Sequence, residues 1–465
     1  MNLHLAVIAG YSLALMVLGL WIGRRVRGAT DFFVAGRRLG PGLIFSTMLA
    51  ANIGAGSTVG ATAQGYTTGL SAWWWVGSAA IGSTVLAFWV GPAMRRVSSA
   101  QGLRTVGDFL EFRYSASVRG IVSLILWIGS LFILSSQLIG LAWILNVVAG
   151  IPKPIGAAVG GGVITVYFAA GGLLTSSRVN VVQLAVKLAG FAVALPLAIA
   201  AAGGWSGIAR VTAPDPAYWS FWRWDVSWGF LISFAPAFVV SPGLLQKIFG
   251  ARDDRAVRVG VGLNALGLFL YAGVPVVLGI AARGMLAPLA DSQQALPVIL
   301  MKALPPIVGA LGLAAVFSAE ISAADAVMLM LTTSLSQDLY KRFMAPEASD
   351  DRVMHVARAA TLASGVIGVG VAATDVSIAT VVTIFYTLLT VCLVVPVVGG
   401  LFVRCLTSRD ATTSILAGVS AMLIIQLATQ GRGWGLLTPA LGGLCAAVVF
   451  TGASHALVSD RGHPR

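Results

Sequence analysis

The chain has 465 residues, of which 57% are apolar and 10% are charged, and its mean hydropathy is +0.89. Soluble globular proteins contain about 45–50% apolar and about 25% charged residues, so the composition excludes a soluble enzyme and predicts an all-α integral membrane protein. The net charge of +13 would suit a nucleic-acid partner, but the basic residues follow the expected membrane topology, so we expect no nucleic acid. The three cysteines lack metal-ligand spacing, so we expect neither a disulfide framework nor a metal site of that kind.

Apolar runs long enough to cross a bilayer follow one another along nearly the whole chain. The first run, Leu3–Gly23, is followed by arginines and has no small-residue cleavage site, so we expect a retained helix. We expect about thirteen transmembrane helices in a single transmembrane domain over 1–465. The expected spans are 3–23, 40–63, 70–94, 118–149, 155–171, 179–202, 227–248, 257–282, 304–337, 355–374, 377–403, 412–430 and 434–457.

Lysine and arginine concentrate in connections that fall on the same side of the membrane. Because positive loops stay in the cytoplasm, the distribution predicts an external N-terminus and a cytoplasmic C-terminus. The basic connections are 24–39, 95–117, 247–258, 338–358 and 404–411.

Two expected spans carry residues that interrupt a helix near the middle of the bilayer. The second span contains Asn52, Gly54 and Gly56, and the seventh span, five helices later, contains Ser241 and Pro242. Such a break in a membrane helix has to line a cavity or be buried in protein. Paired interruptions in two halves of a chain are typical of a transporter site between inverted repeats. Glycine and proline that only serve close helix packing are the alternative explanation.

Five motifs in order resemble the sodium:solute symporter family, which contains sodium-coupled sugar, proline and pantothenate transporters. They are Asp31–Arg38 (DFFVAGRR), Ala50–Ile53 (AANI), Thr105–Tyr114 (TVGDFLEFRY), Gly171–Leu173 (GGL) and Ser334–Tyr340 (SLSQDLY). The resemblance implies a LeuT-like core of two inverted five-helix repeats over 40–403. One extra helix, 3–23, would precede this core, and two trailing helices, 412–457, would follow it.

The resemblance also implies a sodium site between the first broken helix and the ninth span. The backbone carbonyls of Ala50 and Ile53 would lie opposite Ala319, Ser322 and Ala323. Hard cations prefer several oxygen ligands, and the family usually supplies a hydroxyl at the last of these positions. Ala323 supplies none, so water or a neighbouring group would have to replace it. Taken alone, a serine such as Ser322 more often bonds back to its own helix.

Lys187 lies in the middle of the expected span 179–202, where a charge is functional by default. Asn180, seven residues earlier on the same helix face, takes a position where sugar-transporting relatives would carry an acidic residue near the ion path. The Lys187 ammonium could replace the missing sodium ligand or exchange a proton. The alternative is a structural ion pair with Glu320 or Asp325.

The sequence says less about the solute. Position 76, where sugar-transporting relatives would place a glutamate, is Val76, so a hydroxyl-rich ligand would find few partners. The run Trp73–Trp75 is expected in the interfacial aromatic belt rather than in a substrate cage. Each polar candidate could equally form a bond between helices. The candidate substrate contacts are Asn52, Ser57, Gln137, Ser233 and Ser241.

Together these features predict a plasma-membrane secondary active transporter that couples uptake of a small organic solute to sodium by alternating access. No cofactor is expected, and the partners are the solute, the sodium ion and the lipid bilayer. Proton-coupled or Lys187-based, ion-independent transport is the alternative, and a channel-like or solute-sensing protein is the remote one. Because no Walker A loop, kinase signature or HExxH motif occurs, an enzyme is not expected. The motifs specify neither the solute nor an oligomeric state.

Overall fold

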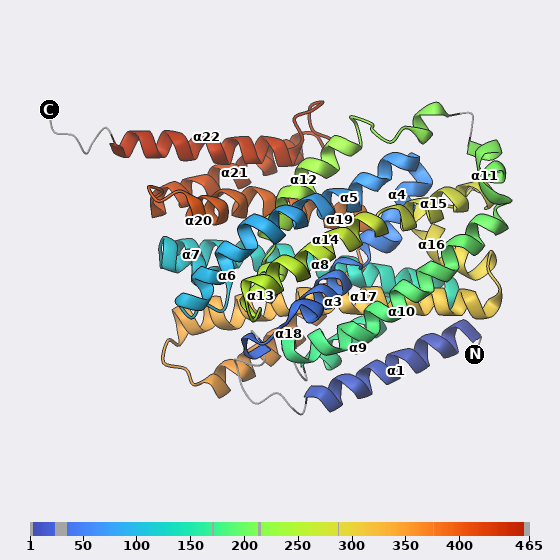
Figure 1. Cartoon of the computed structure of the whole chain (residues 1–465), viewed down its shortest axis with the longest axis horizontal. Coiled ribbons are helices and arrows are strands. Elements are labelled where there is room, and N and C mark those ends of the chain that lie inside the picture. The colour runs from blue at the N-terminus through green and yellow to red at the C-terminus, as the bar shows by residue number, and fades with distance from the viewer. Residues whose placement is uncertain are drawn as a thin grey trace.

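The computed structural model describes residues 3–23, 35–169, 172–212, 215–286, 288–374 and 376–459. In these ranges the regular structure is helical, apart from two isolated β-bridges. Figure 1 shows the long helices as one elongated bundle, in which α1 begins at the end opposite to the one where α22 ends. The basic positions in 24–34, the first four residues of the first motif and Gly171 of the fourth motif lie outside the described residues.

The helices follow the expected spans, with short connecting helices between them. In chain order they are α1 (Leu3–Gly23), η1 (Ala35–Arg37), α3 (Pro41–Asn52), η2 (Gly56–Gly60), α4 (Ala61–Thr68), η3 (Gly69–Ala72), α5 (Trp73–Val85), η4 (Leu86–Val90), α6 (Gly91–Ala100), α7 (Val106–Arg113), α8 (Ala116–Ala149), α9 (Lys153–Ala169), α10 (Gly172–Ala201), α11 (Gly204–Thr212), η5 (Pro216–Trp219), α12 (Ser227–Val240), α13 (Pro242–Phe249), α14 (Asp254–Tyr271), α15 (Gly273–Met285), η6 (Ser292–Gln294), α16 (Ala295–Lys302), α17 (Pro306–Thr333), η7 (Ser334–Met344), α18 (Asp350–Ala372), α19 (Ile378–Leu393), η8 (Val394–Gly399), α20 (Gly400–Phe402), α21 (Ser408–Ala428) and α22 (Pro439–Ser459).

Eleven helical stretches of the described residues are long and apolar enough to cross a membrane. The expected number of about thirteen is higher for two reasons. The stretch Gly56–Ala100 joins parts of two expected spans, and α3 and α9 have only 12 and 17 residues. The helix α10 begins at Gly172, seven residues before the expected span. The number of crossings therefore stays a prediction, while the apolar helical architecture is observed.

The first interruption lies where the sequence indicated it. The helix α3 ends at Asn52, and Ile53 has an extended backbone with φ −93° and ψ 90°. Gly54 allows the broken chain to pack closely, because an added Cβ would lie 2.3 Å from the Ala323 Cβ and 2.6 Å from Gln137 Oε1. The chain resumes as the π-helical turn η2, so the carbonyls at the end of α3 are left outside a regular helix.

The second interruption separates α12 from α13. Ser241 has φ −55° and ψ 121°, which ends α12 at Val240, and Pro242 begins the next helix. Proline at the first position of a helix costs no hydrogen bond because that N–H has no partner within the helix. Both halves of the expected core therefore begin with a broken helix.

Three helices meet around the first break. The helix α10 packs against both α3 and α17, and α17 also packs against α3. Small residues allow the close approach of α10 and α17, since a Cβ added to Gly190 would lie 2.4 Å from the Ala315 Cβ. Side chains from α10 and α17 therefore lie close to the backbone carbonyls at the end of α3.

A charged network joins α7, α8 and η7 at one end of the bundle. The Arg119 guanidinium lies 2.7 Å from Asp338, 2.8 Å from Asp108 and 3.0 Å from Glu111. Arginine suits this role because its planar group has five donors in a fixed geometry. The third and fifth sequence motifs therefore meet in the fold, which gives them a structural role in holding these helices together.

Glu111 connects this network to Arg342, which lies 2.7 Å away. Partial burial raises the pKa of Glu111, but hydrogen bonds from Arg342 and Arg119 outweigh that effect and hold the pKa below its ordinary value. Glu111 therefore favours its charged form in the folded protein.

Candidate functional site

Lys187 projects from the middle of α10 into the centre of the bundle and is completely buried. Its Nζ donates hydrogen bonds to the Ala50 carbonyl at 2.5 Å, to the Ile53 carbonyl at 3.1 Å and to the Ser322 hydroxyl. An ammonium has three N–H donors, so every donor is used. Because two acceptors belong to the break after α3 and the third to α17, this one side chain connects three helices.

These acceptors belong to the set that the family resemblance assigns to sodium. The Ser322 hydroxyl also donates to the Ala50 carbonyl at 2.8 Å and to the Ala319 carbonyl at 3.1 Å. The structure thus gathers Ala50, Ile53, Ala319 and Ser322 around the Lys187 ammonium. Ala323 adds only a methyl group, so no fifth oxygen comes from that side chain.

The hydrogen bonds that the Lys187 ammonium donates do not go to Glu320 or Asp325, the two carboxylates that the sequence offers as partners. All three of its donors go to other oxygens, and Glu320 Oε1 instead accepts from Thr58 Oγ1 at 2.9 Å. Glu320 is completely buried, and its Oε2 has no hydrogen-bond partner among the described residues. The carboxylates of Glu320 and Asp325 act on the charge of Lys187 through space, which offsets part of the cost of burying it.

Asn180, the second ion-coupling candidate, lies two turns from Lys187 and binds a different part of α3. Its Nδ2 donates to Thr47 Oγ1 at 3.0 Å and to Ser176 Oγ at 3.2 Å. The two candidates therefore share a helix face without sharing acceptors. Asn180 holds α10 against α3 one turn before the break.

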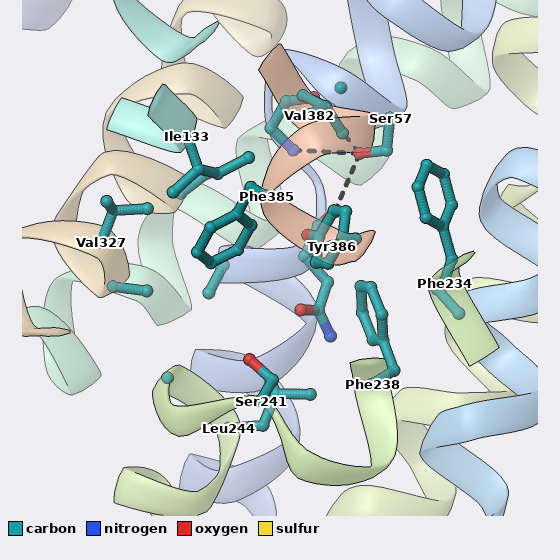
Figure 2. Close-up of a pocket in the computed structure, with 18 of the residues that line it drawn as sticks. Ser57, Ile133, Phe234, Phe238, Ser241, Leu244, Val327, Val382, Phe385 and Tyr386 are labelled. Carbon is teal, nitrogen blue, oxygen red and sulfur yellow. Dashed lines mark hydrogen bonds between the residues drawn. The ribbon is translucent and has the colours of Figure 1, made fainter. Parts of the chain in front are cut away.

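A pocket of about 720 Å³, including the part open to solvent, lies between the two broken helices. Figure 2 shows the aromatic side chains across the middle of the view, with Ser57 above them and Ser241 below. Its lining includes Ala51, Asn52, Gly54, Gly56, Ser57, Trp75, Val76, Ala79, Ile133, Gln137, Phe234, Phe238, Ser241, Gly243, Leu244, Lys247, Leu268, Ala323, Ala326, Val327, Met330, Val382, Phe385 and Tyr386.

Most candidate substrate contacts lie at this pocket. Those that line it are Asn52, Ser57, Gln137 and Ser241. Ser233 lies instead at a separate hollow, where its hydroxyl accepts from Thr387 at 3.4 Å. Its position on α12, two turns before the break, places it away from the central pocket.

Three of the polar side chains at the pocket already have protein partners. The Ser57 hydroxyl donates to the Asn52 carbonyl at 2.8 Å, and Asn52 Nδ2 donates to Asn264 at 3.0 Å. Gln137 Oε1 accepts from the Ala55 N–H at 2.8 Å. The Ser57 and Gln137 bonds satisfy backbone groups freed by the first break, as expected for irregular structure inside a membrane protein, whereas the Asn52 bond joins two side chains.

Two pocket residues differ from the expectations of the sequence. Trp75 was expected in the interfacial belt, but it is 3% exposed and lines the pocket. Lys247 was counted in the basic connection 247–258, yet it lies in the last turn of α13 and is 2% exposed. Both residues lie within a turn of the end of a helix, and that turn faces the interior of the bundle.

Comparisons with known proteins bear on the family and the fold of the chain. Residues 32–418 match the model of the sodium:solute symporter family. The chain is 25% identical to a high-affinity proline transporter of Bacillus subtilis, over 76% of this chain and 77% of that protein. It is 23% identical to a sodium/glucose cotransporter of Vibrio parahaemolyticus, over 91% of this chain and 80% of that protein.

A solved structure has a similar fold over nearly the whole chain. It is a sodium-coupled sialic acid symporter in a substrate-bound, outward-open state, with a TM-score of 0.84, 18% identity and 98% of each chain covered. This likeness confirms the expected LeuT-like fold class. Because the family model covers most of the sequence, the chain belongs to the sodium:solute symporter family.

Proposed function

We propose that the pocket between the two broken helices carries a small organic solute, and that the oxygens around Lys187 form the position of the coupling cation. Family membership makes the chain a sodium-coupled solute symporter rather than an enzyme. The midplane breaks support the location, because discontinuous helices are where transporters of this kind bind substrates and ions.

The position of Lys187 carries the proposal. Its ammonium uses the carbonyls of Ala50 and Ile53 and the hydroxyl of Ser322, and these are the oxygens that a sodium ion would coordinate. Two cations in one site would repel each other, and the same lone pairs cannot serve both. Sodium and the Lys187 ammonium are therefore alternative occupants, and sodium coupling at this position requires the lysine side chain to withdraw.

The same observation favours a second candidate function. If Lys187 remains in the site throughout the transport cycle, the ammonium acts as a built-in cation, and transport at this position needs no sodium. An ammonium needs three acceptors, whereas sodium usually takes more oxygens. Because Ala323 supplies no hydroxyl, the site suits an ammonium better than sodium.

We further propose that the protein lies in the plasma membrane with its N-terminus outside and its C-terminus in the cytoplasm. The positive-inside distribution supports this orientation. The start of α1 and the end of α22 lie at opposite ends of the bundle (Figure 1), in agreement with an odd number of crossings.

Uptake by purified protein in liposomes tests the function. A library of labelled small solutes is offered with an inward sodium gradient, and with choline replacing sodium on both sides. Accumulation of one solute class only with the sodium gradient is the expected result. Equal uptake under both conditions would replace sodium coupling with the built-in cation, and no uptake of any solute would contradict the proposed transport function.

A further inference from the structure

Lys247 is a buried amine that the transport site described so far leaves unused. It lies on α13, directly after the second break, and is 2% exposed. Its Nζ makes no hydrogen bond to any described residue, although the side chain lines the central pocket. Buried ammonium groups are normally paired or hydrogen-bonded because desolvation is costly. A buried amine at the edge of a pocket, without a hydrogen-bond partner among the described residues, is placed to bind an acceptor on a solute.

The other polar groups leave little hydrogen-bonding capacity for a hydroxyl-rich solute. Asn52, Ser57 and Gln137 bond to the first break and to neighbouring helices. Ser241 is the exception: it begins α13 without a side-chain capping bond and lines the pocket. An amine and a hydroxyl, close in sequence on the second broken helix, are thus available to a solute.

Aromatic side chains form much of the pocket wall. The Phe234 and Phe238 rings each pack against Tyr386 (Figure 2), with centroids 5.0 Å and 5.1 Å apart, and the Trp75 ring centroid lies 5.4 Å from that of Phe234. Phe385 lies 5.2 Å from Tyr386. Aromatic and aliphatic linings bind the apolar part of a ligand, whereas a few polar groups fix its orientation.

We propose that the pocket binds a small organic monocarboxylate with an apolar or aromatic body, and that the carboxylate accepts hydrogen bonds from the amine of Lys247. This assignment rests on the proposed role of the pocket as the solute site. A carboxylate would give the amine the partner that it lacks, and a charge-assisted bond is about twice as strong as a neutral one. The apolar body would meet the aromatic wall rather than the occupied polar groups.

The competing explanation is that Lys247 only balances the charge of Asp325, which acts on it through space. A pair of that kind would stabilise the fold without contacting the solute. The two explanations differ in what Lys247→Met does to ligand preference, because only a ligand contact distinguishes a carboxylate from its uncharged amide.

Binding of matched acid and amide probes to the purified full-length protein tests the proposal. The probes are phenylacetate with phenylacetamide and 4-methylpentanoate with 4-methylpentanamide, and the readout is the ligand-induced rise in unfolding temperature across a concentration series. We expect each acid to bind the unmodified protein at least about tenfold more tightly than its amide, as hydrogen bonds to a charged group imply. Lys247→Met should lose this preference and still bind the amide, whereas Lys247→Arg should keep part of it.

Lys302→Met, which removes an exposed lysine of α16, is the control and should retain the full preference. Retained amide binding shows that the Lys247→Met protein is folded; if that protein is unstable, the double variant with Asp325→Asn is tested instead. Acid preference that survives in Lys247→Met or in the double variant would overturn the proposal. If no acid binds but the solute library contains another sodium-driven substrate, the carboxylate assignment fails while the transport function stands.

Discussion

Replacing Lys187 by alanine should convert the ammonium position into a cavity that a sodium ion can enter. The substitution removes three charge-assisted hydrogen bonds and leaves the completely buried Glu320 without the nearby positive charge. Leaving a buried acceptor without its donor costs about 1–3 kcal/mol. We therefore expect a clearly lower unfolding temperature in sodium-free buffer.

Sodium should restore much of this loss. A ligand that binds only the folded state at a hundred times its dissociation constant contributes about 2.7 kcal/mol, which is comparable to the cost of the substitution. The assay is thermal unfolding in detergent over a series of sodium chloride concentrations, with choline chloride holding the ionic strength constant. The variant should gain more stability from sodium than the unmodified protein does.

A matched variant separates ion binding from a change in fold. Lys187→Met also removes the charge, but its side chain fills much of the space in which sodium would bind, so sodium should not rescue it. If the alanine and methionine variants respond equally to sodium, or if neither is destabilised, the inferred competition between sodium and the ammonium is refuted.

Three further expectations follow from other parts of the molecule. Ser322→Ala should raise the sodium concentration for half-maximal uptake by roughly tenfold, the scale on which losing one group at a metal site lowers affinity, while Ala323→Ser should lower it by supplying an oxygen. Because the pKa of Glu111 lies below its ordinary value of 4.5, its stabilising effect should be complete above that pH and disappear as the pH falls through the lowered pKa. Glu111→Gln should thus be less stable than the unmodified protein at neutral pH, and the difference in unfolding temperature should shrink in acid. A cysteine introduced at Arg252 should react with a membrane-impermeant reagent only after the cells are opened, since the positive-inside rule places this residue in the cytoplasm.

Each of these expectations has a result that would contradict it. If the sodium dependence of uptake is unchanged in both Ser322→Ala and Ala323→Ser, then α17 does not contribute to the cation position. A stability difference for Glu111→Gln that stays constant down to acidic pH would show that its charge does not contribute through the network. Labelling of intact cells would reverse the orientation; this experiment first replaces Cys405 and Cys445, which are exposed.

The broken helices could be predicted from the sequence because local residues cause them. Pro242 lacks a backbone donor, and Gly54 fits where any side chain would collide with Ala323 and Gln137. Such residues produce their effect within one or two turns, so the pattern indicates the location. The motif resemblance extended this local information to the whole fold.

The partners of Lys187 could not be read from helix periodicity. That periodicity indicated a shared face with Asn180 and offered Glu320 and Asp325 as ion-pair partners, but it contains no information on how α10 packs against α3. The observed acceptors are mostly backbone carbonyls, which every residue has, so no residue type identifies them. Lys247 was missed for a related reason, because the orientation of the short helix α13 determines whether its last turn faces the pocket or the cytoplasm.

A structure of the Lys187→Ala variant, determined once in sodium chloride and once in choline chloride, would show whether the lysine and the coupling ion share one position. We expect density for an ion between the Ala50 and Ile53 carbonyls and the Ser322 hydroxyl in sodium alone, at the position that the ammonium takes in the unmodified protein. The same oxygens drawn apart, or no ion between them in sodium, would contradict the claim that this lysine and the coupling ion occupy one site.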